Sequence, residues 1–259
     1  MDFDRHCTEI VTQTGLLRAS LPGVDQRAPV PSCPGWDVNA LLRHVGEAHR
    51  WIGATVAVPS DTPPPQDAVR QVTGHTDTDP VALGDWLADG AEQLAATLRR
   101  AGPDGPAWTP IPDGLATATF HARRMAHETV MHRADAQLVI GAEFDLADDV
   151  AADGIDEWCE LGSLPMMFDV HPEQRELLGP GRTILLDGGE GGRWMMDMTG
   201  ARLDFGRTTG DETATTTVRG PVTDLLLMIF RRKAPGDLDV TVEGDSDLLR
   251  FWLDRVSFA

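Results

Sequence analysis

The stretch from Asp37 to Thr55, DVNALLRHVGEAHRWIGAT, carries the strongest helical pattern in the first half of the chain. Its apolar residues recur at three- and four-residue spacing, as on one face of a helix: Val38, Leu41, Leu42, Val45, Ala48 and Ile52. Asp37 stands directly before them, where a side-chain oxygen can accept hydrogen bonds from the first backbone N–H groups. The stretch therefore predicts a helix that buries one face against neighbouring helices.

Similar helical patterns surround this stretch. They cover residues 3–20, 81–100 and 117–138, and sequences rich in Pro and Gly separate them. Four helices joined by loops favour a helix bundle, because each helix has to bury its apolar face against another. We therefore expect residues 1–143 to form a four-helix bundle.

The pattern changes in the second half of the chain. After a predicted helix at 147–161, short strand-like runs separated by Gly-rich turns cover residues 182–186, 193–198, 201–205 and 215–218. Predicted helices at 221–232 and 246–256 flank one more strand at 238–242. The runs predict an antiparallel meander with helices, so we expect a two-domain α+β fold whose second domain, 144–259, has a small antiparallel sheet.

Composition excludes several classes of protein. The 259 residues are 41% hydrophobic and 24% charged, as in ordinary globular proteins. The net charge of -19 opposes binding to nucleic-acid phosphates, and no apolar run approaches the roughly 20 residues that span a membrane. Cys7, Cys33 and Cys159 form no CxxC pair and leave an odd thiol, which indicates a reducing compartment. We expect a cytoplasmic bacterial protein that binds neither nucleic acid nor membrane.

Glu128 and His132 stand four residues apart on a predicted helix, so both side chains lie on one face and can chelate one divalent ion. His127 is five residues from His132 and points away, unlike the HExxH pattern of zinc proteases. His44, beside the apolar stripe of its helix, is the best candidate for a third ligand, whereas His49 points elsewhere. On spacing alone, two other interpretations are commoner than a metal site. His44 would be a hydrogen-bonded core histidine, and Glu128 and His132 would form a simple surface pair.

Residues 30–51 read VPSCPGWDVNALLRHVGEAHRW, and residues 124–135 read RMAHETVMHRAD. These two segments resemble the mycothiol-dependent maleylpyruvate isomerase family of actinobacteria. This resemblance implies a DinB-like four-helix domain that binds a metal ion. Later segments, VRGPVTDLLLMIFRRK at 218–233 and LDVTVEGD at 238–245, resemble the family's C-terminal domain, an α+β unit similar to sterol carrier proteins.

The resemblance also implies site residues and a cosubstrate. By position, the family's metal ligands fall on His44, Glu128 and His132, with zinc or another divalent ion as the metal. The thiol cosubstrate implied is mycothiol. The family's functional arginine, taken as catalytic, falls on Arg232, with Arg231 as the alternative because this chain reads Phe-Arg-Arg-Lys there.

Two histidines and one carboxylate leave an open position on zinc, which is typical of a catalytic site. We therefore expect a metal-dependent mycothiol S-transferase that acts on a small electrophile, in detoxification or natural-product tailoring. A mycothiol-dependent cis-trans isomerase of the maleylpyruvate type is the first alternative. A thiol-independent metal hydrolase or tailoring enzyme, or a binding protein without catalysis, also fits the same residues. The electrophile and the oligomeric state stay open.

Overall fold

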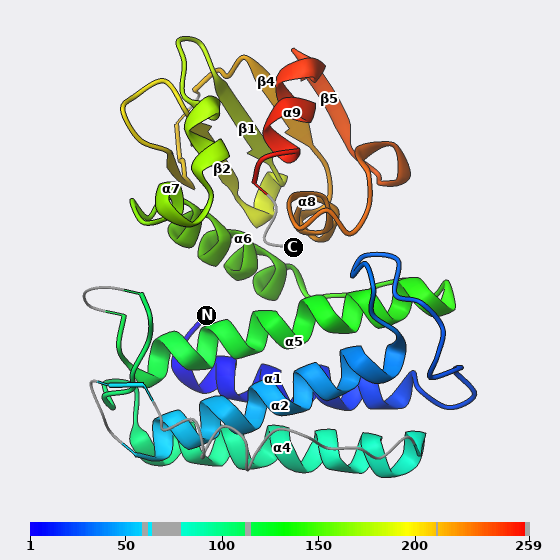
Figure 1. The fold of residues 1–259 in the computed structure, drawn as a ribbon. Coiled ribbons are helices and arrows are strands. Elements are labelled where there is room, and N and C mark those ends of the chain that lie inside the picture. Colours follow the sequence, from blue (N-terminus) through cyan, green and yellow to red (C-terminus); the bar gives the residue numbers. More distant parts are fainter. Residues whose placement is uncertain (59–61, 64–78, 112–114, 211, 257–259) are drawn as a thin grey trace. The chain divides into compact units, whose positions relative to one another are not determined.

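The computed structural model describes residues 1–58, 62–63, 79–111, 115–210 and 212–256. The chain divides into two compact units, Met1–Phe144 and Asp145–Ala259 (Figure 1). The first unit is helical and the second combines helices with a sheet, so the expected two-domain α+β fold is confirmed. Each unit is described by itself below.

Four long helices build the described part of the N-terminal unit. They are α1 (Phe3–Ala19), α2 (Val38–Ala57), α4 (Pro80–Ala101) and α5 (Ala118–Ile140). The residue before each helix, Asp2, Asp37, Asp79 or Thr117, has a side-chain oxygen that accepts a hydrogen bond from a first-turn N–H group. These caps satisfy backbone donors that the helix itself leaves unpaired. The predicted cap at Asp37 is thus confirmed.

The buried face of α2 is the one that its sequence pattern predicts. Leu41, Leu42 and Val45 are fully buried in one apolar cluster, and Ile52 and Val56 belong to a second cluster further along the helix. Helix α2 therefore contributes to the core along most of its length. This packing fixes its rotation about its own axis and leaves neighbouring positions at the border between core and solvent.

The C-terminal unit contains a five-stranded sheet with helices. Its helices are α6 (Asp148–Gly162), α7 (Met167–Val170), α8 (Val222–Ile229) and α9 (Ser246–Leu253), with short 3-10 helices at Pro172–Leu177, Gly189–Gly191 and Pro235–Asp237. Its strands are β1 (Thr183–Asp187), β2 (Arg193–Asp197), β3 (Asp204–Arg207), β4 (Thr216–Arg219) and β5 (Thr241–Gly244). They lie side by side in the order β3-β2-β1-β4-β5 (Figure 1).

The sheet is mixed, so the prediction of a purely antiparallel meander is wrong for one strand pair. Strands β1 and β4 are parallel, with Ile184 opposite Thr216, whereas the other three pairs are antiparallel. After two hairpins β3 runs in the direction of β1, and the chain then returns to the far side of β1 before β4 begins. Gly-rich turns in the sequence indicate where strands end. They do not indicate which strands become neighbours in the sheet.

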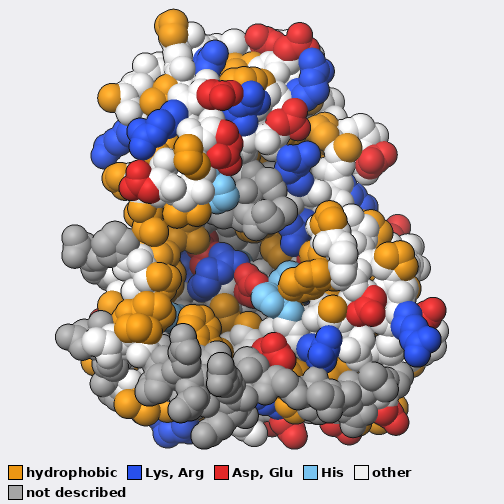
Figure 2. Space-filling model, in the orientation of Figure 1, with side chains coloured by type: hydrophobic (Ala, Val, Ile, Leu, Met, Phe, Trp, Pro, Cys, Tyr) orange, Lys and Arg blue, Asp and Glu red, His pale blue; other side chains and the backbone are white. Residues whose placement is uncertain are grey.

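Charged side chains of both signs occur on the surface of both units. On the face drawn in Figure 2, Lys and Arg side chains lie among Asp and Glu side chains rather than in one patch of a single sign. Among the residues that the structure describes, no helix combines the length and apolar character needed to cross a membrane.

Helices α2 and α4 approach closely at Gly46. A Cβ atom added to Gly46 would lie 2.0 Å from the ring of Trp86, so a side chain at this position requires the indole to move. The guanidinium of Arg50 lies 3.9 Å from the centroid of the same ring and donates to the carbonyl oxygen of Trp86 at 2.7 Å. Contacts from one face of α2 thus hold Trp86 against Gly46, and position 46 needs the absence of a side chain.

We predict that Gly46→Ala destabilises the N-terminal unit. Overpacking a core costs about 1–3 kcal/mol, whereas Gly→Ala inside a helix contributes up to about 1 kcal/mol of stability. The clash with Trp86 outweighs the gain in helix propensity, so the melting temperature falls by a few degrees. Gly53→Ala in the same helix is the matched control, because its added Cβ meets only Leu94 at 4.0 Å. A Gly46→Ala protein as stable as the Gly53→Ala protein would contradict the packing described here.

Candidate metal centre

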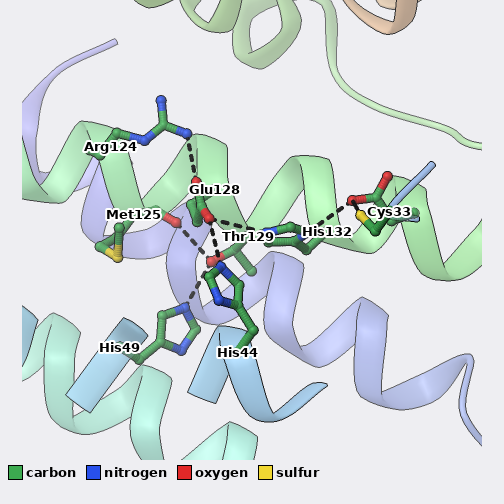
Figure 3. A network of polar contacts seen from close by, with 9 residues as sticks. Cys33, His44, His49, Arg124, Met125, Glu128, Thr129 and His132 are labelled. Carbon is green, nitrogen blue, oxygen red and sulfur yellow. Dashed lines mark hydrogen bonds and ion pairs between the residues drawn. The ribbon is translucent and has the colours of Figure 1, made fainter. Parts of the chain in front are cut away.

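Three of the side chains predicted from the sequence converge in the N-terminal unit. His44 comes from α2, and Glu128 and His132 come from successive turns of α5 (Figure 3). The Nε2 atoms of His44 and His132 lie 3.2 Å and 3.1 Å from the same oxygen, Oε1 of Glu128. One ligand atom from each residue lies within 4.8 Å of the others, which makes the group a candidate metal site. Their role as ligands stays a prediction.

The group opens to solvent on one side. The exposed fraction of the side chain is 40% for His44, 25% for Glu128 and 10% for His132. Exposure therefore increases from the α5 histidine towards the α2 histidine. A small molecule approaching from solvent reaches the His44 side of the group first.

Glu128 is held as a carboxylate. Burial alone would raise its pKa, but hydrogen bonds with His132 and His44 and the charge of Arg124 hold the pKa of Glu128 well below its usual range. The Nη2 atom of Arg124, one helical turn earlier, lies 2.9 Å from Oε2, so the two carboxylate oxygens have different partners. The arginine takes one oxygen and leaves the other directed towards the two imidazoles.

His132 lies between two carboxylates. Its Nδ1 atom is 2.8 Å from Oδ2 of Asp135, and its Nε2 atom faces Glu128. Burial would lower the pKa of His132, but its hydrogen bonds with Asp135, Cys33 and Glu128 raise that pKa well above the ordinary value. The surroundings of this imidazole therefore favour positive charge, and at Nε2 a proton and a metal ion would compete for the same lone pair.

A second ring of residues surrounds the three donors. Asp135 is completely buried and accepts a hydrogen bond from Oγ of Ser32 at 2.6 Å. The indole of Trp36 lies 4.8 Å from the ring of His44 and 6.1 Å from that of His132, measured between centroids. Sequence reasoning assigned no role to Ser32, Trp36 or Asp135. The one local signal was that Asp135 follows His132 by three positions, which places both on one helix face.

His49 has a different partner, as its position on the helix predicted. The hydroxyl of Thr129 donates to the carbonyl oxygen of Met125 at 2.7 Å, so its oxygen accepts from Nε2 of His49 at 2.8 Å. Burial and then the charge of Arg50 lower the pKa of His49 to about 3, so this imidazole is neutral. Figure 3 shows His49 below Thr129, outside the group formed by His44, Glu128 and His132.

None of the three cysteines takes part in a disulfide. Burial raises the pKa of Cys7 to about 11 and that of Cys159 well above its ordinary value, so both remain thiols at neutral pH. Cys33 is partly buried and donates to Oδ2 of Asp135 at a sulfur–oxygen distance of 3.5 Å. In this position the thiol acts as a hydrogen-bond donor to a carboxylate.

The two candidate arginines follow helix α8 in the C-terminal unit. Nη1 of Arg232 donates to the carbonyl oxygen of Phe230 at 2.9 Å, which satisfies the end of that helix. Arg231 has a backbone φ of 57°, a conformation that is uncommon for a residue with a side chain. Together with Lys233 and Arg250, it lines a cavity of about 430 Å³ whose other lining residues are mostly apolar. Arg231 also pairs with Asp254, another lining residue, at 3.6 Å. Arg231 thus lies beside a cavity and Arg232 at a helix end, and a functional role for either stays a prediction.

Comparisons with known proteins agree with this architecture. A family model described as the mycothiol maleylpyruvate isomerase N-terminal domain matches residues 7–137. Two crystal structures of the mycothiol-dependent maleylpyruvate isomerase have a similar fold over 94% of this chain and 93% of theirs. The TM-scores are 0.59 at 16% identity, for a histidine-to-alanine mutant, and 0.57 at 17% identity. No curated protein was found to match.

The resemblance that the two N-terminal segments indicated is thereby confirmed. The matched residues include His44, Glu128 and His132 together with the loop that contains Ser32, and they extend over half of the chain. This chain belongs to the mycothiol maleylpyruvate isomerase N-terminal domain family.

Proposed function

We propose that this protein is a metal-dependent mycothiol S-transferase that acts on a small electrophile. The observation that carries the proposal is the convergence of His44 and His132 on one carboxylate oxygen of Glu128. Membership of an enzyme family whose name includes mycothiol supports this thiol as the cosubstrate. The partial exposure of His44 supports access by a small molecule.

The donor set suits a divalent metal ion. Two imidazole nitrogens and one carboxylate oxygen form a typical zinc-binding set, and three protein ligands leave room for a further ligand. The residues that would hold the ion are His44, Glu128 and His132, and the flanking carboxylate of Asp135 adds to the negative charge that favours a cation. A bound divalent ion stabilises the deprotonated form of a coordinated thiol.

The surrounding residues prepare the site for this chemistry. Arg124 binds Oε2 of Glu128 and keeps Oε1 directed towards the imidazoles. Trp36 packs against His44 and His132 and so excludes water from one side of the group. In the transfer step the sulfur of mycothiol forms a bond to an electrophilic carbon, whose leaving group departs with its bonding electrons. The thiol proton goes to solvent.

The isomerase alternative shares the first bond-forming step. Sulfur would add to an activated double bond, rotation would follow about the resulting single bond, and elimination of the thiol would restore the double bond in the other geometry. The name of the family favours this alternative, because it refers to an isomerase. The two reactions differ in their product, since a transferase consumes mycothiol and an isomerase returns it.

We predict that His132→Ala abolishes both metal binding and activity. The variant loses one of three ligands, and elemental analysis of protein purified without chelators should find about one divalent ion in the wild type and almost none in the variant. His171→Ala is the control for loss of a histidine, because His171 belongs to the C-terminal unit and pairs with Glu173 at 3.3 Å. Full metal occupancy in His132→Ala would show that the ligand assignment is wrong.

A second prediction concerns the thiol. Because Cys7 and Cys159 are buried thiols and Cys33 donates to a carboxylate, we expect turnover to depend saturably on added mycothiol. Incubating the wild type with mycothiol and a panel of electrophiles, followed by mass spectrometry, should detect a thioether product. Return of unchanged mycothiol with an isomerised electrophile would favour the isomerase. Turnover without any added thiol would contradict both reactions.

A third prediction compares the two arginines. Arg231 lines the cavity, so we expect Arg231→Ala to raise the KM for an anionic electrophile or for mycothiol about tenfold, equivalent to about 1.4 kcal/mol, while leaving the metal bound. Arg232→Ala removes a contact with the end of α8 and should lower the melting temperature more than it changes KM. The reverse result would assign the functional role to Arg232, and unchanged kinetics in both variants would remove both from the mechanism.

A further inference from the structure

Asp135 is the centre of a buried network that lies behind the candidate ligands. Its Oδ1 atom accepts from Oγ of Ser32 at 2.6 Å, and its Oδ2 atom accepts from Sγ of Cys33 at 3.5 Å. The same Oδ2 atom lies 2.8 Å from Nδ1 of His132. The carboxylate is completely buried, so these side chains replace the water that would otherwise solvate its charge.

The contact with Asp135 decides which nitrogen of His132 is available. A carboxylate can only accept hydrogen bonds, so Nδ1 must carry the proton that lies between the two groups. The Nε2 atom faces a second carboxylate, Oε1 of Glu128, at 3.1 Å, so a metal ion bound there would take the place of the Nε2 proton while Asp135 keeps the proton on Nδ1. Removing Asp135 would leave the choice between the two tautomers and the orientation of the ring to weaker forces.

The loop before α2 holds this carboxylate in place. Its two ends are joined by backbone hydrogen bonds, including one from the N–H of Val30 to the carbonyl oxygen of Trp36 at 2.9 Å. The loop supplies Ser32 and Cys33 to Asp135, and it supplies Trp36 to the rings of His44 and His132. One closed loop therefore contacts both the carboxylate of Asp135 and the imidazole rings of the candidate metal centre.

We infer that Asp135, held by Ser32 and Cys33, is a positioning residue that fixes His132 as an Nε2 ligand and thereby strengthens metal binding. The inference rests on the proposed function, because it assumes that His132 binds a metal ion. Outer carboxylates that orient a ligating histidine typically change metal affinity about 10- to 100-fold. Cys33 is in this view a hydrogen-bond donor, and its thiol is not the nucleophile.

A second metal ion is the competing explanation for this cluster. Cys33, His132 and Asp135 also have ligand atoms within 4.8 Å of one another. However, both oxygens of Asp135 already accept hydrogen bonds, and the side chain is completely buried. An ion between these three residues would have to replace the Cys33 thiol proton and the His132 Nδ1 proton, both of which now lie towards Oδ2 of Asp135. The geometry therefore supports an outer carboxylate better than a second ion.

The test measures zinc affinity in the full chain by competition with a chromophoric chelator. Asp135→Asn should bind zinc about tenfold more weakly, and Asp135→Ala up to about 100-fold more weakly, since the carboxamide still accepts from Nδ1. Glu9→Gln is the matched control. Glu9 is a buried carboxylate of the same unit that accepts from Gln13 at 2.7 Å and pairs with Arg5 at 3.0 Å, so its loss should affect stability without changing zinc affinity.

Two further measurements separate positioning from general stability. In the zinc-loaded wild type, NMR should detect a slowly exchanging Nδ1 proton on His132, and this proton should exchange faster in Asp135→Asn. Ser32→Ala should weaken zinc binding in the wild type but have little additional effect in Asp135→Asn, because Ser32 acts through the carboxylate. The Asn side chain has the same size and shape as Asp, so Asp135→Asn can be measured even if Asp135→Ala does not fold.

The outcomes distinguish this inference from the proposed function. Zinc binding by the wild type, with weaker binding in Asp135→Asn and unchanged binding in Glu9→Gln, supports both. Wild-type affinity in Asp135→Asn and Asp135→Ala overturns the positioning role and leaves the proposed metal site intact. Two zinc ions per wild-type chain, one of which is lost in Asp135→Asn, would favour the second-ion explanation and overturn the inference. A wild type that binds no divalent ion overturns both the inference and the proposed function.

Discussion

The arrangement of the N-terminal unit depends on one partly buried carboxylate, Glu128. Its charge is compensated by the imidazoles of His44 and His132 and by the guanidinium of Arg124. Because His44 comes from α2 and the other partners come from α5, the same carboxylate joins two helices. Compensation of this partly buried charge thus constrains how α2 and α5 pack, and this packing brings together the side chains that would bind a metal ion.

Residues around this centre hold the candidate ligands in place through a second contact. Arg124 occupies one oxygen of Glu128, and Asp135 occupies one nitrogen of His132. In each case the outer contact leaves the opposite atom of the side chain directed at the common centre. A site whose ligands are each held by a second contact needs little reorganisation when a cation binds, which is the usual advantage of preorganisation.

The three donors would not by themselves distinguish transfer from isomerisation under the proposed function. A metal ion held by them would favour the ionised form of a bound thiol, which both reactions require. The outcome would then depend on whether the electrophile loses a leaving group or the adduct eliminates the thiol. Under the same proposal, Arg231 and the cavity that it lines are the candidate features of the C-terminal unit for electrophile binding.

The sequence by itself determined the features that follow from local helix geometry. These include the cap at Asp37, the buried stripe of α2 and the common face of Glu128 and His132, because 3.6 residues per turn relate spacing directly to direction. Tertiary structure alone decided that Ser32 meets Asp135, 103 positions away, and that β4 lies parallel to β1. Contacts of this kind depend on how whole elements pack and on the path the chain takes between them. No short-range pattern records that information. The contact between His132 and Asp135 differs, because the two residues stand three positions apart on one helix face, but spacing alone does not show that the carboxylate is buried there by Ser32 and Cys33.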